Sequence, residues 1–193
     1  MLENEMKKIS TKNLTLIGLF TALIVIGALI RIPVPVVPFT LQFLFTTLAG
    51  LLLGGKNGAI SVGVYIILGL LGLPVFASGG GISYVLNPTF GYLIGFCAGT
   101  YLTGRIANAN PRPSFKRLLA ACFSGLLVVY LFGLFYYYII SDLYLGNPIG
   151  LWPLFLYGFI LAVPGDIVLC IFSAVLGKRL IPLIQRIGCD VYV

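Results

Sequence analysis

Asp166 is the residue whose position most strongly indicates a chemical role, because this acid falls inside a long apolar stretch. The chain of 193 residues has five acidic residues and no histidine. A charge at membrane depth costs roughly 2.5–3.5 kcal/mol on insertion scales and usually faces an interior cavity. Gly158, Ala162, Cys170 and Ala174 share its helix face at four-residue spacing. The pattern predicts a buried carboxylate that accepts hydrogen bonds from a ligand, or else a structural hydrogen bond to a neighbouring helix.

A second group of polar side chains lies in the glycine-rich segment 78–92. Gln42, which follows Pro38 closely, adds an amide near the same end of the predicted spans. Consecutive glycines allow a ligand to approach the backbone closely. Tyrosines offer a flat apolar face with a polar tip, and amides offer both donors and an acceptor. The alternatives to ligand binding are purely structural: a membrane-surface turn for segment 78–92 and an interhelical hydrogen bond for the glutamine. The predicted substrate-binding residues are Asp166, Asn87, Tyr92, Tyr84, Gln42, Gly79, Gly80 and Ser83.

The composition indicates an integral membrane protein. The chain is 60% hydrophobic and 9% charged, whereas a soluble domain carries roughly 25% charged residues. One membrane carboxylate without histidine supplies neither a general base near neutral pH nor an aspartyl dyad. The four cysteines show no CxxC pair or zinc-type spacing. We therefore expect no enzyme activity, no catalytic residue, no metal site and no cofactor.

Apolar runs divided by Gly, Pro and charged connectors predict an all-α membrane domain with six transmembrane helices. Residues 1–193 form one domain, with a basic cytoplasmic N-terminus at 1–12, a six-helix bundle at 14–178 and a cytoplasmic tail at 179–193. The predicted spans are Leu14–Ile30, Phe39–Gly54, Gly58–Pro74, the run after Pro88, Leu118–Ile140 and Trp152–Gly177.

The basic residues predict the orientation of these spans in the cell membrane. All of the 12 Lys and Arg except Arg31 fall on one side, which the positive-inside rule makes cytoplasmic, so both termini lie inside. This periodic distribution forms no continuous basic face, so nucleic acid is not expected as a partner. The basic clusters are explained by topology.

Small residues at four-residue spacing form ridges that let helices approach closely in lipid. For Thr46-Gly50-Gly54 and Gly91-Gly95-Gly99, packing within the bundle is the simplest interpretation. Gly18 and Ala22, near the start of the first span, are the best candidates for docking a separate membrane subunit.

Five segments, in order along the chain, carry a resemblance to a known family. They are Pro35-Val-Val-Pro-Phe-Thr-Leu-Gln42, Leu48-Ala-Gly-Leu-Leu-Leu-Gly54, Gly69-Leu-Leu-Gly-Leu-Pro-Val-Phe76, Asn87-Pro-Thr-Phe-Gly-Tyr-Leu-Ile-Gly-Phe96 and Pro164-Gly-Asp166. Together these segments resemble the BioY family, the biotin-specific substrate-capture (S) components of energy-coupling factor (ECF) transporters.

The resemblance implies that biotin is captured at the outer face and delivered inward by an ATP-driven module. The implied partners are a transmembrane coupling subunit, which meets the Gly18 and Ala22 face, and two cytoplasmic ATPases. Asp166 would accept from a ureido N–H, Gln42 or Asn87 would serve the ureido carbonyl, and Tyr84 or Tyr92 would cover the ring.

One residue departs from the family pattern. Many members carry Pro-Gly-Asp-x-x-Lys, and Leu169 occupies the lysine position here. Recognition of the carboxylate tail would then depend on Arg31, Ser78, Ser83 or loop amides. The alternatives are an S component for another vitamin or small solute, and an oligomeric channel.

Overall fold

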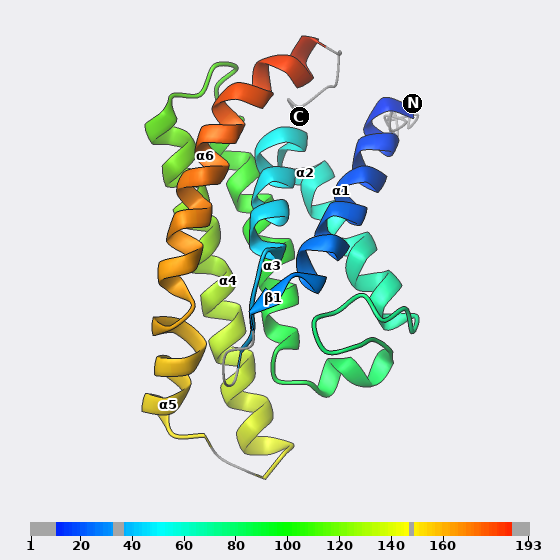
Figure 1. The fold of residues 1–193 in the computed structure, drawn as a ribbon, viewed down its shortest axis with the longest axis vertical. Coiled ribbons are helices and arrows are strands. Elements are labelled where there is room, and N and C mark those ends of the chain that lie inside the picture. Colours follow the sequence, from blue (N-terminus) through cyan, green and yellow to red (C-terminus); the bar gives the residue numbers. More distant parts are fainter. Residues whose placement is uncertain (1–10, 33–36, 147–148, 187–193) are drawn as a thin grey trace, which may run out of the picture.

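The computed structural model describes residues 11–32, 37–146 and 149–186, which form a bundle of helices. The start of α1 and the end of α6 lie at the same end of the bundle (Figure 1). Lys7 and Lys8 of the predicted cytoplasmic N-terminus, and the predicted cytoplasmic tail beyond Arg186, lie outside the described residues. The elements are α1 (Thr11–Leu29), β1 (Arg31–Ile32), β2 (Phe39–Thr40), α2 (Gln42–Leu70), the 3-10 helix η1 (Ile82–Leu86), α3 (Phe90–Ala107), α4 (Phe115–Leu143), α5 (Leu151–Phe155), the π-helical η2 (Leu156–Ile160) and α6 (Val163–Arg186).

Helix α2 reverses direction at Gly54, where the backbone has φ 81° and ψ 172°. A Cβ atom placed on Gly58 would lie 2.9 Å from the carbonyl oxygen of Ala49. In a straight helix these nine residues would separate the two positions by roughly 13 Å along the axis. The two arms of α2 therefore pack side by side as a helical hairpin (Figure 1, cyan to teal).

The predicted count of six membrane helices is not confirmed. The predicted spans Phe39–Gly54 and Gly58–Pro74 correspond to the two arms of the continuous element α2, which meet at the non-helical residue Gly54. Within the described residues, four helical segments are long and apolar enough to cross a membrane. These are Thr11–Leu29, Gln42–Leu70, Phe115–Leu143 and Leu151–Arg186.

The last predicted span, Trp152–Gly177, is interrupted in the structure. A π-helical segment and a turn separate α5 from α6, and α6 continues to Arg186. Pro164 is tolerated because it lies in the first turn of α6, where backbone N–H groups have no helical partner. Asp166 consequently lies near a helix N-terminus, where the helix dipole favours a negative side chain.

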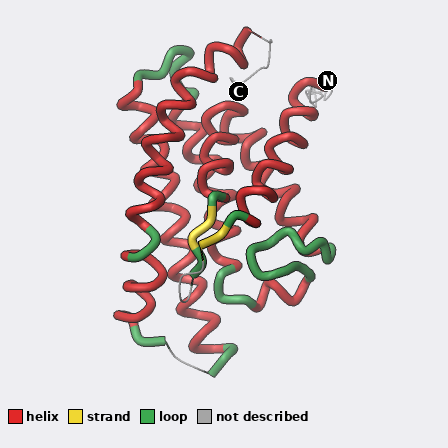
Figure 2. Tube along the Cα trace, viewed as in Figure 1, coloured by secondary structure: helices red, strands yellow, loops and turns green. Residues whose placement is uncertain are grey.

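Two short strands correct the all-α prediction. β1 pairs antiparallel with β2, with Arg31 opposite Thr40 and Ile32 opposite Phe39 (Figure 2, yellow). The connection includes Pro33 and Pro35, which lie outside the described residues. A proline-rich stretch cannot continue α1, so its flanks pair as strands instead. The hairpin leads directly into Gln42 at the start of α2.

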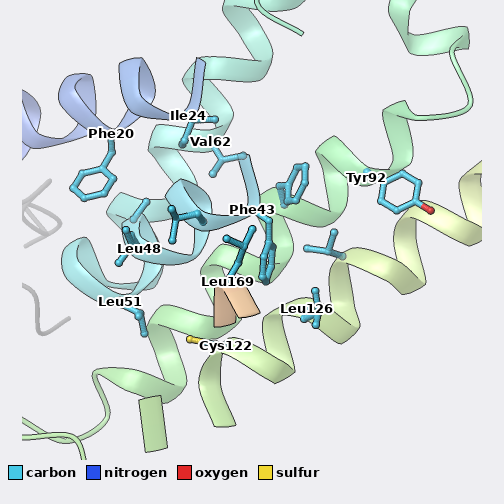
Figure 3. Packing of buried hydrophobic residues seen from close by; sticks show 14 of the residues in the cluster. Phe20, Ile24, Phe43, Leu48, Leu51, Val62, Tyr92, Cys122, Leu126 and Leu169 are labelled. Carbon is cyan, nitrogen blue, oxygen red and sulfur yellow. The ribbon is translucent and has the colours of Figure 1, made fainter. Parts of the chain in front are cut away.

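Buried apolar side chains from α1, α2, α3, α4 and α6 fill the centre of the bundle (Figure 3). The two predicted glycine ridges pack inside it: a Cβ on Gly50 would meet the Thr100 carbonyl oxygen at 2.6 Å, and one on Gly99 would meet the Gly125 carbonyl oxygen at 2.8 Å. Gly18 differs from both, because a Cβ there would meet nothing within 4 Å. The outer face of α1 is therefore not used for packing within the described chain.

Candidate ligand-binding cavity

A cavity opens between the β-hairpin, the start of α2, η1, α3, α4 and the start of α6. It encloses about 640 Å³ of space, including its open mouth. Its walls are mainly apolar, with a few polar side chains converging from separate elements. The lining residues are Val37, Pro38, Phe39, Thr40, Gln42, Phe43, Ala77, Tyr84, Thr89, Tyr92, Leu93, Phe96, Val129, Tyr130, Ala162 and Asp166.

Asp166 is 8% exposed and lines this cavity. Its Oδ2 accepts a hydrogen bond of 2.5 Å from the hydroxyl of Tyr130 on α4. Its Oδ1 makes no hydrogen bond with the described residues. Oδ1 is also not one of the fully buried side-chain atoms that lack a hydrogen-bond partner. One carboxylate oxygen is thus held in place while the other remains available to a ligand.

Aromatic side chains support the Asp166 end of the cavity. The Tyr92 hydroxyl donates to the carbonyl oxygen of Gly158 in η2 at 3.0 Å. The rings of Tyr92 and Tyr130 meet edge to face with centroids 6.0 Å apart, and Phe159 meets Tyr130 at 5.0 Å. Such edge contacts fix ring orientation. Tyr92 therefore presents its ring, while its hydroxyl proton is used within the protein.

Gln42 reaches the cavity from the first turn of α2. The side chain is 3% exposed, and Nε2 is buried without a hydrogen-bond partner among the described residues. The Tyr65 hydroxyl lies near this amide, but it donates to the Val75 carbonyl oxygen at 3.3 Å. Gln42 therefore lines the cavity with its Nε2 buried beside the Tyr65 hydroxyl, whose oxygen can still accept a hydrogen bond.

Asn87 acts on the cavity through its neighbours, because it does not line the wall itself. Its Oδ1 accepts from the backbone N–H of Thr89 at 3.0 Å and from the Thr89 hydroxyl at 2.7 Å. The Tyr84 hydroxyl lies 3.3 Å from the Thr89 hydroxyl. Because the Thr89 hydroxyl donates its proton to Asn87, the Tyr84 hydroxyl is the donor to Thr89. This series of hydrogen bonds orients the two hydroxyls that line the cavity.

The glycine loop shapes the surroundings without lining the cavity. Gly79, with φ 119°, pairs with Phe76 in an isolated bridge. Gly80 lies against the Leu73 carbonyl, where no Cβ would fit. Ser83 is exposed and makes no contact with the cavity. The structure therefore brings together Asp166, Gln42, Tyr84 and Tyr92 at the wall, with Asn87 behind it.

Arg31 lies beside the mouth of the cavity. Its guanidinium donates to the carbonyl oxygen of Ala77, a residue that lines the cavity. Arg31, Ala77, Ser78 and Gly79 also line a shallower depression, so the two hollows share Ala77 as a border. Leu169, in contrast, is buried in the apolar core and does not reach the cavity (Figure 3).

Tyr130 and Thr89 were missed by the sequence analysis. Tyr130 lies 36 residues before Asp166, so no local spacing connects the two. The available signal was a tyrosine hydroxyl within an apolar run, since such a hydroxyl normally requires a partner when buried. Thr89 follows Asn87-Pro88, and its role depends on the turn that Asn87 closes.

The polar groups of the cavity can bind a largely apolar ligand that has hydrogen-bond donors and an acceptor. A carboxylate oxygen accepts, an amide N–H donates, and aromatic rings supply flat apolar contact. Among the residues that the structure describes, no Lys or Arg lines the cavity wall. The described residues contain no group of three or more His, Cys, Asp or Glu side chains placed to hold a metal ion.

Comparisons with known proteins agree with this architecture. A crystal structure described as the S-component for biotin from an ECF-type ABC transporter matches with a TM-score of 0.71 at 31% identity, covering 88% of this chain and 90% of that one. A probable biotin transporter BioY of Lysinibacillus sphaericus is 45% identical over 91% of this chain and 89% of its own length. Biotin transporter BioY of Rhizobium etli is 34% identical over 88% of this chain and 92% of its own length.

The family model described as the BioY family matches residues 3–186, a range that includes each wall of the cavity. With this match and these relatives, the chain belongs to the BioY family.

Proposed function

We propose that this protein captures biotin at the outer face of the membrane and delivers it inward as the S component of an ECF transporter. The observation that supports this most directly is Asp166. It lines an apolar cavity with one oxygen fixed by Tyr130 and the other without a protein partner. The relatives reported above, which are described as biotin transporters and a biotin S-component, identify biotin as the ligand to test.

The chemistry of biotin matches the polar groups of the cavity. Its ureido ring has two N–H donors and a carbonyl acceptor, and its thiolane ring and chain are apolar. We assign Asp166 Oδ1 to accept from one ureido N–H, a charge-assisted hydrogen bond that is stronger away from water. The unpaired Gln42 Nε2 would donate to the ureido carbonyl. The rings of Tyr84 and Tyr92 would cover the bicycle.

We place the carboxylate tail at the mouth of the cavity, near Arg31. The mouth borders the depression that contains the Arg31 guanidinium, and Leu169 lies in the core instead. Arg31 makes no ion pair with the described residues, and its bond to the Ala77 carbonyl uses one of five N–H donors. A cation here would attract the tail without entering the apolar part of the site.

The proposed transport cycle takes its energy from other subunits. The segment Gly50-Leu-Leu-Leu-Gly54-Gly55-Lys56 has the spacing of a phosphate loop, but Asn57 follows it where Ser or Thr would hold magnesium, and it lies within α2. The partners would be a transmembrane coupling subunit, docked on the Gly18 and Ala22 face of α1, and two cytoplasmic ATPases. Both side chains are exposed on α1. We count the arms of α2 as separate membrane passages, which with α1, α3, α4 and the α5–α6 segment makes six helices in the membrane.

Calorimetric titration of the purified protein with biotin tests the proposal. Asp166→Asn removes the charged acceptor, and a hydrogen bond to a charged group is worth about 1.5–3 kcal/mol. We expect biotin to bind the parent protein and to bind Asp166→Asn at least tenfold more weakly. Asp142→Asn, a change at an exposed acid outside the cavity, serves as the matched control and should bind normally.

The same titration separates the two ends of the ligand. Arg31→Gln should weaken the binding of biotin but leave that of biotinamide, whose tail is neutral, nearly unchanged. Equal loss for both ligands would remove Arg31 from tail recognition. Absence of biotin binding to the parent protein, with binding of a different vitamin, would replace biotin as the substrate.

A further inference from the structure

A second hollow, separate from the cavity that Asp166 lines, lies between the α3–α4 connection and the end of α6. Figure 1 shows both of these segments at the upper end of the bundle. We call it the basic groove. It encloses about 900 Å³, including its opening. Prolines and Ile181 form its apolar floor, and three cations border it. The lining residues are Pro111, Arg112, Pro113, Lys178, Ile181, Pro182, Gln185 and Arg186.

The cations of the basic groove are not neutralised by the described protein. The described acidic residues are Asp142 near the end of α4 and Asp166 in the outer cavity, and neither lines the groove. Arg112, Lys178 and Arg186 make no ion pair with described residues. Lys178 Nζ donates to the Pro113 carbonyl oxygen at 2.9 Å, which holds the ammonium in the groove while leaving two of its N–H donors for a ligand.

An apolar stripe on α6 leads along the helix to this groove. Ile171 and Val175 are 45% and 39% exposed. Lys178 follows Val175 by three residues, and Pro182 follows Lys178 by four. These positions share one helix face. Lys178 lies about 4.5 Å beyond Val175 along the axis. On this face of α6, the first cation of the groove therefore follows directly after exposed apolar side chains.

We infer that the basic groove binds the phosphate headgroup of an anionic membrane lipid. The three cations supply charge complementarity, and basic pockets of this kind at the ends of membrane helices bind anionic headgroups. The stripe on α6 gives the acyl chains an apolar surface directly beside the headgroup. A free phosphate would use only the cations, so the stripe favours a lipid over a soluble anion.

The experiment measures thermal stabilisation of the purified protein in neutral detergent by short-chain phosphatidylglycerol. Ligand at ten times its Kd should raise Tm by about 3–6 °C for a chain of this size. Phosphatidylcholine with the same chains and inorganic phosphate are the comparison ligands. We expect phosphatidylglycerol to raise Tm, and the other two to have little effect.

Two variants with equal charge changes locate the effect. Arg112→Gln/Lys178→Gln/Arg186→Gln empties the groove of cations and should abolish the shift, since each cation removed weakens lipid binding about fivefold. Lys56→Gln/Lys116→Gln/Arg179→Gln changes three exposed cations outside the groove and should keep it. Arg112→Gln/Arg186→Gln, which retains the Lys178 hydrogen bond to Pro113, repeats the test if the triple variant does not fold.

Three results would overturn the inference. Equal loss in the groove and control variants would indicate diffuse attraction, and an unchanged shift in the groove variants would place the lipid elsewhere. A full shift with inorganic phosphate would identify a soluble anion as the ligand. A groove variant that responds normally to lipid but no longer co-purifies with a coupling subunit would identify the groove as a protein-docking surface.

Discussion

Gln42 has a buried amide whose Nε2 makes no hydrogen bond with the described residues. A buried unsatisfied donor costs about 1–3 kcal/mol, whereas an apolar side chain of similar shape costs nothing comparable. On our assignment of this amide to the ureido carbonyl, bound biotin would relieve that cost. This is the kind of residue at which stability and function oppose each other.

Replacing Gln42 by Met tests that opposition. We expect Gln42→Met to raise the free energy of unfolding of the ligand-free protein by about 1 kcal/mol and to weaken biotin binding roughly two- to tenfold. Thermal unfolding with and without biotin measures both effects.

Leu44→Met, a volume-conserving change at a buried position two residues further along α2, is the control for the introduction of methionine. It should alter neither quantity appreciably. Unchanged biotin affinity in Gln42→Met would show that the amide only fills space, and our assignment of it to the ureido carbonyl would be wrong.

Helix α1 has one face buried in the bundle and one face that the other described residues leave exposed. Ile17, Phe20 and Ile24 are buried against the other helices, whereas Gly18 and Ala22 are exposed. Small residues at this spacing allow close approach of another helix in lipid. A bulky side chain on this face would keep a partner helix at a distance without affecting the cavity.

Gly18→Leu should leave biotin binding by the isolated protein unchanged and reduce co-purification with the coupling subunit at least tenfold. Gly63→Leu is the matched control, because a Cβ on Gly63 in α2 also meets nothing within 4 Å. Normal complex formation by Gly18→Leu, or an equal defect in Gly63→Leu, would contradict docking on α1.

The whole bundle separates its charges between two ends. The turn of α2, the α3–α4 connection, and the ends of α1 and α6 carry the described basic residues other than Arg31, and they gather at the end drawn uppermost (Figure 1). β1, which contains Arg31, lies away from this end, near the middle of the bundle as drawn (Figure 1). With the basic end cytoplasmic by the positive-inside rule, we predict that the cavity opens to the outside.

Single cysteines at exposed loop positions test this orientation. In a variant with the half-buried Cys97 and with Cys189 replaced by Ser, Ser83→Cys should react with a membrane-impermeant maleimide in intact cells, and Asn110→Cys should react only in inside-out vesicles. Both positions are exposed, while Cys122 and Cys170 are buried and should remain unlabelled. The reverse labelling pattern would place the cavity on the cytoplasmic side.

The sequence by itself determined the class of the protein, the burial of Asp166 and the face of α6 that Asp166 shares with Cys170 and Ala174. Gly158 and Ala162, also predicted for this face, lie in η2 and the turn after it, outside the regular α-helical period. These properties are local: they depend on composition and on the 3.6-residue helical period, so neighbouring residues are sufficient to predict them. Gln42, Tyr84 and Tyr92 were likewise identified as candidates from their residue types and their places next to proline and glycine.

Only the tertiary structure decided which candidates meet. The reversal of α2 at Gly54 and the pairing of Tyr130 with Asp166 join residues that are distant in sequence, and single-sequence periodicity carries no information on such contacts. The interruption before α6 could not be predicted either, because the hydropathy of an apolar run is the same whether the run forms one helix or two. Backbone torsion angles and side-chain packing determine where a helix turns or breaks, and hydropathy averaged along the sequence carries no information on either.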